Sequence, residues 1–190
     1  MIFLYVLASY FVGNMMSAYV VMKFMKGEDI RKLGSGNVGA RNAGRLLGKK
    51  GFLLTALGDV LKGVLVVLGA KYLGFSFEFQ ILSLIAVVVG HIWPITLKFK
   101  GGKGIATAAG GLVVLAYQPF LVFGGIFLLL LAFSRSFTLA GMTAFFTIPF
   151  IYWFMDYSLL ECVLIFIVIA FLLFAHRDNL KERLGKEKIK

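Results

Sequence analysis

The sequence is poor in the residues that build disulfides, metal sites and the common hydrolase centres. Its single cysteine, Cys162, lies in an apolar run and excludes an intrachain disulfide, so nothing indicates an oxidised extracellular domain. The sequence has no CxxC motif, HExxH motif or carboxylate cluster, so we expect no metal ion. It also lacks a Gly-x-Ser-x-Gly elbow and a histidine followed four residues later by an acid, which argues against an α/β-hydrolase and a His-Asp dyad. A catalytic triad assembled in space stays open.

Acidic residues are scarce as well. The 190-residue chain has 9 Asp and Glu against 20 Lys and Arg, a formal net charge of +11. Its hydrophobic fraction of 60% and mean hydropathy of +0.91 exceed those of a soluble domain, where roughly half of the residues are apolar. We therefore predict a single all-α integral membrane domain over residues 1–190. Because no positive charge precedes the first apolar run, we expect a retained membrane helix and not a cleaved signal peptide.

Seven apolar runs follow one another along the chain. They cover residues 2–22, 51–72, 79–97, 105–117, 120–133, 137–154 and 158–174. A helix of ~20 apolar residues crosses a bilayer, so some of these runs are short for a full crossing. If Gln118-Pro119 is a turn, the fold is a bundle of seven transmembrane helices; if the short central runs are re-entrant, five longer crossings remain. We predict seven.

The distribution of basic residues predicts the orientation. With the N-terminus outside, eighteen of the twenty Lys and Arg fall inside, in residues 23–50, 98–104, 134–136 and 176–190. The outer turns carry Glu78 and Asp156 and no basic residue. This arrangement follows the positive-inside rule, so we predict a cytoplasmic C-terminus. Three polar, basic segments then share the cytoplasmic face, namely residues 34–45, 100–107 and 176–184.

The first of these segments, residues 34–45, reads Gly-Ser-Gly-Asn-Val-Gly-Ala-Arg-Asn-Ala-Gly-Arg. Glycines let a backbone come close to a ligand, and arginine forks match phosphate oxygens. A plain basic loop on anionic lipid would explain the arginines but not Ser35, Asn37 and Asn42. The spacing of Gly34 and Gly39 is that of a nucleotide P-loop, but the required Lys-Ser/Thr is missing, which excludes ATP hydrolysis. The composition favours an anion-binding site.

The other two segments have the same character. In residues 100–107, a glycine-rich turn with Lys103 opens a helix, and helix N-termini hold anions. A flexible basic turn is the alternative. Residues 176–179 end the last apolar run with His176-Arg177-Asp178-Asn179. A stop signal needs only Lys or Arg, so His176 and Asn179 point to a further role.

Two charged residues, Asp59 and Lys62, interrupt the second apolar run. At i,i+3 spacing they can pair on one helix face, and charges at membrane depth usually face the interior as a pair or a site. A structural ion pair and a contribution to the site are both compatible with this pattern. His91, two residues before Trp93-Pro94, is interpreted as an interfacial anchor or a helix end.

Taken together, these segments resemble the bacterial acyl-phosphate:glycerol-3-phosphate acyltransferase (PlsY) family. The resemblance runs through the whole chain in order. It is carried by Gly34–Ala40 with Asn42 and Arg45, Asp59 with Lys62-Gly63, Gly90-His91, Lys100–Gly104 with Ala106-Thr107, and His176-Arg177 with Asn179 and Arg183-Leu184. One position departs from the family: Arg41 stands where a Gly-Ala-Thr-Asn pattern has Thr, so the role of Arg41 is open.

The resemblance implies seven membrane helices in the bacterial cytoplasmic (inner) membrane, with the active site facing the cytoplasm. It implies transfer of a fatty acyl group from acyl phosphate to the sn-1 hydroxyl of glycerol 3-phosphate, which gives lysophosphatidate for phospholipid biosynthesis. We expect neither a metal nor an organic cofactor, and no nucleic acid partner. We expect the protein to be a monomer surrounded by membrane lipid. We hypothesise four catalytic residues, Ser35, Asn37, Lys103 and His176. The substrate phosphates would be bound by Gly36, Gly39, Asn42, Arg45, Lys62, Gly101, Gly102, Gly104, Thr107 and Asn179.

Other classes fit the sequence less well. A small anion transporter also uses broken helices, but it predicts inverted repeats with polar breaks at mid-depth, and the sequence shows none. A protein that only binds acidic lipid would leave Asn37, Asn42 and Asn179 without a role. A phosphatidyl transferase would need an aspartate cluster that the chain lacks.

Overall fold

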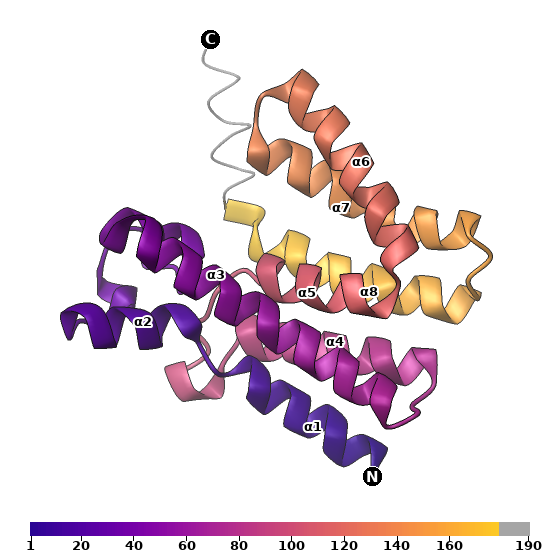
Figure 1. Ribbon diagram of the computed structural model, residues 1–190, viewed down its shortest axis with the longest axis horizontal. Helices are drawn as coiled ribbons and strands as arrows, with labels where there is room; N and C mark the ends of the chain where they lie inside the picture. The colour runs from indigo at the N-terminus through magenta and orange to yellow at the C-terminus, as the bar shows by residue number, and fades with distance from the viewer. Residues whose placement is uncertain (179–190) are drawn as a thin grey trace. The chain divides into compact units, whose positions relative to one another are not determined.

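The computed structural model describes residues 1–178, and within them every regular element is a helix (Figure 1). The chain forms two compact units, Met1–Leu115 and a second that begins at Ala116. Four described segments are long and apolar enough to cross a membrane: Ile2–Lys26, Ala40–Tyr72, Phe77–Leu97 and Tyr117–Ser134. Three shorter apolar helices accompany them. The all-helical prediction is confirmed for the described part of the chain.

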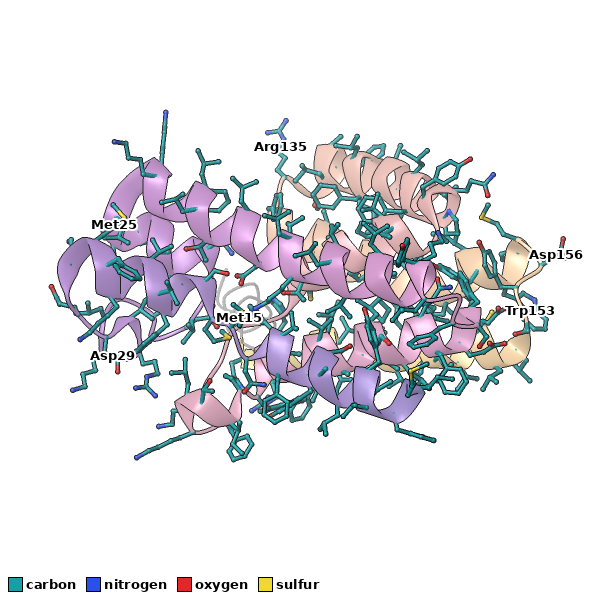
Figure 2. All side chains as sticks on the ribbon, turned by 60° about the horizontal axis from the view of Figure 1, so that its bottom comes forward. Met15, Met25, Asp29, Arg135, Trp153 and Asp156 are labelled. Atoms are coloured by element: carbon teal, nitrogen blue, oxygen red, sulfur yellow. The ribbon has the colours of Figure 1, made fainter. Side chains whose placement is uncertain are left out.

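The first predicted membrane helix is interrupted within the first unit. α1 (Ile2–Gly13) ends and α2 (Ser17–Lys26) begins after an extended Met16, so the prediction of one continuous helix over residues 2–22 is wrong, although Ile2–Lys26 as a whole is long and apolar enough to cross a membrane. At the break, the Asn14 side chain donates to the Tyr10 carbonyl at 2.7 Å. This local bond competes with continued helix, as short polar side chains commonly do. Met15 lies at this break (Figure 2).

The second predicted helix begins eleven residues earlier than expected. α3 (Ala40–Tyr72) follows the short 3₁₀ helix η1 (Ile30–Lys32), so the second half of the predicted loop 34–45 is helical. Gly48 interrupts α3 with φ 69° and ψ −161°, a backbone conformation open essentially only to glycine. The prediction missed this start because residues 40–50 are too polar to read as a membrane span.

Two helices complete the first unit after α3. α4 (Phe77–Ile92) leads through the 3₁₀ helix η2 (Ile95–Leu97) into a loop, and α5 (Ile105–Leu115) begins where the glycine-rich turn predicts it. α1 packs on α4, and α3 packs on α5. The α3–α5 crossing is very close, because a side chain on Gly63 would collide with the Thr107 carbonyl oxygen. Small residues at such crossings are typical of membrane helices.

In its described part, from residue 116 to 178, the second unit consists of three helices that short turns connect. They are α6 (Tyr117–Ser134), α7 (Phe137–Phe154) and α8 (Leu159–Ala175). The chain turns at Ala116, so Pro119 lies in the first turn of α6, where proline is well tolerated, and not in the predicted turn. Ser158 and Glu161 form a capping box that starts α8. α7 packs against both α6 and α8.

Candidate functional site

The loop before α3 is held by one buried side chain. Asn42 is 1% exposed, and its Oδ1 accepts the Ser35 N–H at 3.0 Å while its Nδ2 donates to the Leu33 carbonyl at 3.0 Å. Gly34 turns the chain with φ 58° directly against Asn42. Ser35 itself is exposed. Asn42 therefore fixes the turn that presents Ser35.

The two glycine-rich segments of the first unit lie side by side. The Val38 N–H donates to the Gly101 carbonyl at 3.4 Å, and Val38 is fully buried. A side chain on Gly102 would lie 2.6 Å from the Val38 carbonyl oxygen. Residues 34–42 and 100–104 are thus in direct contact, although some sixty residues separate them in the sequence.

The backbone donors of the second segment are partly used within the fold. The N–H groups of Gly101 and Gly102 donate to the carbonyls of Ile92 and His91, at 3.2 and 3.0 Å. Gly104 then takes φ 78°, and α5 begins at Ile105. The first-turn N–H groups of a helix have no partner within the helix. The geometry therefore favours the N-terminus of α5, beside Lys103, over the glycine amides as the donor to an anion.

A buried polar network lies behind this loop. Lys62 Nζ is 3.1 Å from Asp59 Oδ1 and 2.7 Å from His91 Nδ1, so the predicted pairing of Asp59 with Lys62 is confirmed. Nζ also donates to the carbonyls of Gly13 and Met15, at 3.2 and 3.1 Å. All three ionisable side chains are at most 5% exposed. Although Asp59 Oδ1 has no hydrogen bond of good geometry, its distance to Nζ defines the ion pair.

For His91, one of the two alternatives from the sequence is confirmed and the other is wrong. It is 3% exposed and faces the interior, so it is not an interfacial anchor, although it does lie in the last turn of α4. Thr107 Oγ1, from α5, lies 3.4 Å from the same Nδ1. The signal available in the sequence was the Gly90-His91 pair within the family resemblance. No spacing in the sequence connects His91 with Lys62.

A basic groove marks the first two turns of α3 and the break after them. It has a volume of about 500 Å³ and is lined by Arg41, Gly44, Arg45, Gly48, Lys49 and Phe52. Arg41 and Arg45 are four residues apart in the first two turns of α3, which places them on one helix face, and Lys49 joins them from beyond the break at Gly48. Arg41, whose role the sequence left open, therefore shares the groove with the predicted phosphate ligand Arg45.

In the second unit, His176 caps the C-terminal end of α8. Its Nδ1 lies 2.9 Å from the Leu172 carbonyl, and the residue is 5% exposed. Arg177 follows with its guanidinium over the Phe174 ring at 4.2 Å. The predicted ligand Asn179 lies outside the described residues, as do Arg183 and Leu184.

Fold and site together define a helical membrane protein whose polar, basic loops are backed by a buried ion pair. A model of the glycerol-3-phosphate acyltransferase family matches residues 3–186. The chain is 43% identical over 181 residues to glycerol-3-phosphate acyltransferase 1 of Desulfitobacterium hafniense, covering 95% of this chain and 90% of that protein. It is also 43% identical over 176 residues to the Bacillus cereus (strain ATCC 14579) protein of the same name, covering 93% and 97%.

Solved structures agree with the sequence relatives. A crystal structure of PlsY (YgiH), an integral membrane glycerol 3-phosphate acyltransferase in its glycerol 3-phosphate form, aligns with a TM-score of 0.88 at 31% identity. The alignment covers 97% of this chain and 92% of that one. The lysophosphatidic acid form of the same protein aligns with a TM-score of 0.86 at 29% identity, over the same shares. The chain belongs to the glycerol-3-phosphate acyltransferase family, and it is a membrane protein.

Proposed function

We propose that the protein transfers a fatty acyl group from acyl phosphate to the sn-1 hydroxyl of glycerol 3-phosphate. The products are lysophosphatidate and inorganic phosphate. The observation that carries the proposal is the family match over residues 3–186, together with a solved relative in glycerol 3-phosphate and lysophosphatidic acid forms. The acyl-phosphate donor fits the chemistry of the loops, because both substrates then bring a phosphate to a basic, donor-rich surface.

The proposed reaction needs no protein nucleophile. Acyl phosphate is an activated mixed anhydride, so the substrate hydroxyl attacks its carbonyl carbon directly, and the bond from that carbon to the phosphate oxygen breaks. The leaving phosphate takes the electron pair. The hydroxyl proton passes to this phosphate or to His176, the two candidate bases. This chemistry explains why a sequence without a His-Asp dyad can encode an acyltransferase.

The predicted site residues are proposed to have two kinds of role. Arg45, Lys103, His176 and Asn179 are proposed to hold the phosphates. Ser35 and Asn37 are proposed to orient the anhydride and stabilise the developing oxyanion with backbone N–H groups. Support for the role of Ser35 comes from Asn42, which accepts the Ser35 N–H and so fixes the turn in which the Ser35 side chain is exposed.

The other predicted phosphate ligands are proposed to act from within the fold. Asn42, Lys62 and Thr107 are buried, and each is engaged with other protein groups. The five glycines would let the loops approach a phosphate closely and pack against each other. They are Gly36, Gly39, Gly101, Gly102 and Gly104.

The proposed setting is the bacterial cytoplasmic membrane. Seven membrane helices, an outer N-terminus, a cytoplasmic site and a monomeric state belong to this proposal. The concentration of Lys and Arg in residues 23–50, 98–104, 134–136 and 176–190 supports the orientation.

The decisive experiment is an assay of the purified protein in detergent and lipid. Glycerol 3-phosphate is supplied with either acyl phosphate or acyl-CoA, and lysophosphatidate and inorganic phosphate are followed. We expect product from acyl phosphate alone. No product from acyl phosphate would refute the proposal, and comparable product from acyl-CoA would refute the assigned donor.

Two variants test the proposed roles. Ser35→Ala should lower the rate roughly a hundredfold, the usual effect of removing one oxyanion donor. His176→Ala distinguishes the two candidate bases, the leaving phosphate and His176. If the variant keeps near-full turnover and the pH–rate profile shows no group that titrates near ~6.5, the leaving phosphate accepts the proton.

A further inference from the structure

We infer that His91 is a positioning residue of the loop formed by residues 100–104, and that Lys62 and Asp59 hold His91 in place. The inference rests on the proposed function, because it assumes that this loop and the α5 N-terminus receive a substrate phosphate. It assigns a role to a histidine that the proposed reaction does not use, and it explains why the family resemblance includes a buried ion pair.

His91 contacts the loop through both its backbone and its ring. Its carbonyl accepts the Gly102 N–H at 3.0 Å. Its Nε2 lies directly against Gly102, so closely that any side chain at that position would collide with the ring. Gly102 is two residues before the Gly104 turn into α5. The imidazole therefore determines where the loop, and with it Lys103, lies relative to the end of α4.

The ring orientation is set from the opposite side. A charged lysine carries three donors and no acceptor, and Asp59 supplies the matching negative charge at 3.1 Å. The shortest polar contact of Lys62 Nζ, 2.7 Å, is to His91 Nδ1. Nδ1 is therefore the acceptor, and the ring proton is assigned to Nε2, the nitrogen that faces Gly102. The lysine fixes both the tautomer and the tilt of the ring, as outer partners do for other functional histidines.

Lys62 also connects this ring to the break in the first membrane segment. Its bonds to the Gly13 and Met15 carbonyls satisfy groups that the interruption between α1 and α2 leaves without helical partners. One ammonium group thus contacts the end of α1 and the end of α4, and it reaches the loop before α5 through His91.

The test compares two substitutions of His91. His91→Asn keeps an acceptor near the position of Nδ1, whereas His91→Leu fills much of the space without one. If His91 positions the loop, His91→Leu should raise the KM for glycerol 3-phosphate or for acyl phosphate by about tenfold or more, the scale of outer-partner losses. His91→Asn keeps the acceptor for Lys62 but leaves the place of Nε2 against Gly102 empty, so it should raise the same KM by less than His91→Leu does.

A purely structural role gives a different result. Fewer folded molecules would lower the maximal rate and the melting temperature but leave both KM values unchanged. That outcome for His91→Leu would overturn the inference. If His91→Leu does not fold, the double variant Asp59→Asn/Lys62→Met replaces it, since this variant removes the lysine donor without leaving a buried charge. A double variant with both KM values unchanged would overturn the inference equally.

Failure of the proposed function is distinguishable from failure of the inference. An unaltered protein that makes no lysophosphatidate would refute the function. An active unaltered protein with unmoved KM values in these variants would refute only the role of His91.

Discussion

At the scale of single residues, polar side chains of the family motifs form the support of the site as well as its surface. Asn42 is fully engaged by Leu33 and Ser35, and Lys62 by two carbonyls, His91 and Asp59. Buried polar groups are retained when their partners are satisfied, and removing one partner leaves the other unpaired. These motif residues therefore determine the shape of a loop, in addition to the phosphate-binding roles proposed for the motif.

Asn42→Ala is predicted to loosen the loop that carries Ser35. It leaves the Leu33 carbonyl and the Ser35 N–H without their partner, which costs about 1–3 kcal/mol. We expect a lower melting temperature in detergent and a turnover reduced by about tenfold, because Ser35 is no longer held in place. Gln118→Ala, which removes an exposed amide on α6, is the control and should change neither quantity. Full turnover of Asn42→Ala would show that Asn42 is not needed to hold Ser35 in place.

Gly102→Ala is predicted to separate the loop from the histidine beneath it. The new Cβ would collide with His91 Nε2 and lie 2.6 Å from the Val38 carbonyl, so the loop must move. Overpacking of this kind costs about 1–3 kcal/mol. We expect most of the acyltransferase activity to be lost. Gly124→Ala on α6 meets no atom within 4 Å and should keep its activity. Equal activity of the two variants would show that the close contact is unimportant.

At the scale of elements, the apolar runs predicted where helices exist better than where they end. The apolar runs became α1 to α8, but the interruption at Asn14–Met16 depends on Lys62 and Thr96, which are distant in sequence. A single polar Asn14 within an apolar run is compatible with a continuous helix as well as with a break, so the sequence alone does not predict the interruption. The polar start of α3 was missed for the opposite reason, because it is helical without being apolar.

The candidate site shows the same limit. Glycine, asparagine and basic residues identified residues 34–45 and 100–107 without any structure, because such composition has no use in an apolar core. The contact between His91 and Lys62 could not be found in this way. It joins two helices across 29 positions, and neither local composition nor helical spacing predicts which ring an ammonium meets.

The turn after α2 is predicted to weaken in acid. Arg31 donates to the Asp29 carboxylate, with a closest distance of 2.6 Å, and lowers the pKa of Asp29 to about 2. Arg31 also donates to the Leu97 carbonyl at 3.2 Å, so the pair joins η1 to η2. Because the folded-state pKa lies below the ordinary value of roughly 3.9, the pair stabilises the fold above about pH 4. This stabilisation is lost as the pH falls towards about 2.

Melting temperatures measured between pH 7 and pH 2 test the pair. Asp29→Asn should melt below the natural protein at neutral pH, and the difference should shrink as the acid protonates Asp29. Asp29 lies in this turn at the end of α2 (Figure 2), and the neighbouring exposed Glu28 gives a matched control. Glu28→Gln should show no such pH-dependent difference. A difference for Asp29→Asn that is constant over the whole range would exclude the ion pair as its cause.

At the scale of the whole molecule, the distribution of Lys and Arg among the loops connects the helices with their proposed orientation in the membrane. Each loop or turn is either basic or nearly free of basic residues. In the second unit this contrast is visible on α7, with Arg135 before its first residue and Asp156 after its last (Figure 2). In the first unit, Glu78 follows the turn after α3, whereas the basic groove marks the start of that helix. The proposed orientation requires that these contrasts reflect two sides of one membrane.

The orientation is predicted to be readable from two serines. Ser76 precedes α4 and Ser134 ends α6; both are exposed, and the proposed topology places them outside and inside. In a background with Cys162→Ala, which removes the single natural thiol, Ser76→Cys and Ser134→Cys each provide one thiol. In right-side-out membrane vesicles, a membrane-impermeant maleimide should label Ser76→Cys at once and Ser134→Cys only after detergent opens the vesicles. The reverse pattern would invert the topology and place the glycine loops outside. Immediate labelling of both would contradict an odd number of crossings between α4 and α6. Because acyl phosphate and glycerol 3-phosphate carry charges that do not cross a bilayer unaided, the side of these loops decides which pool of substrates the enzyme can use.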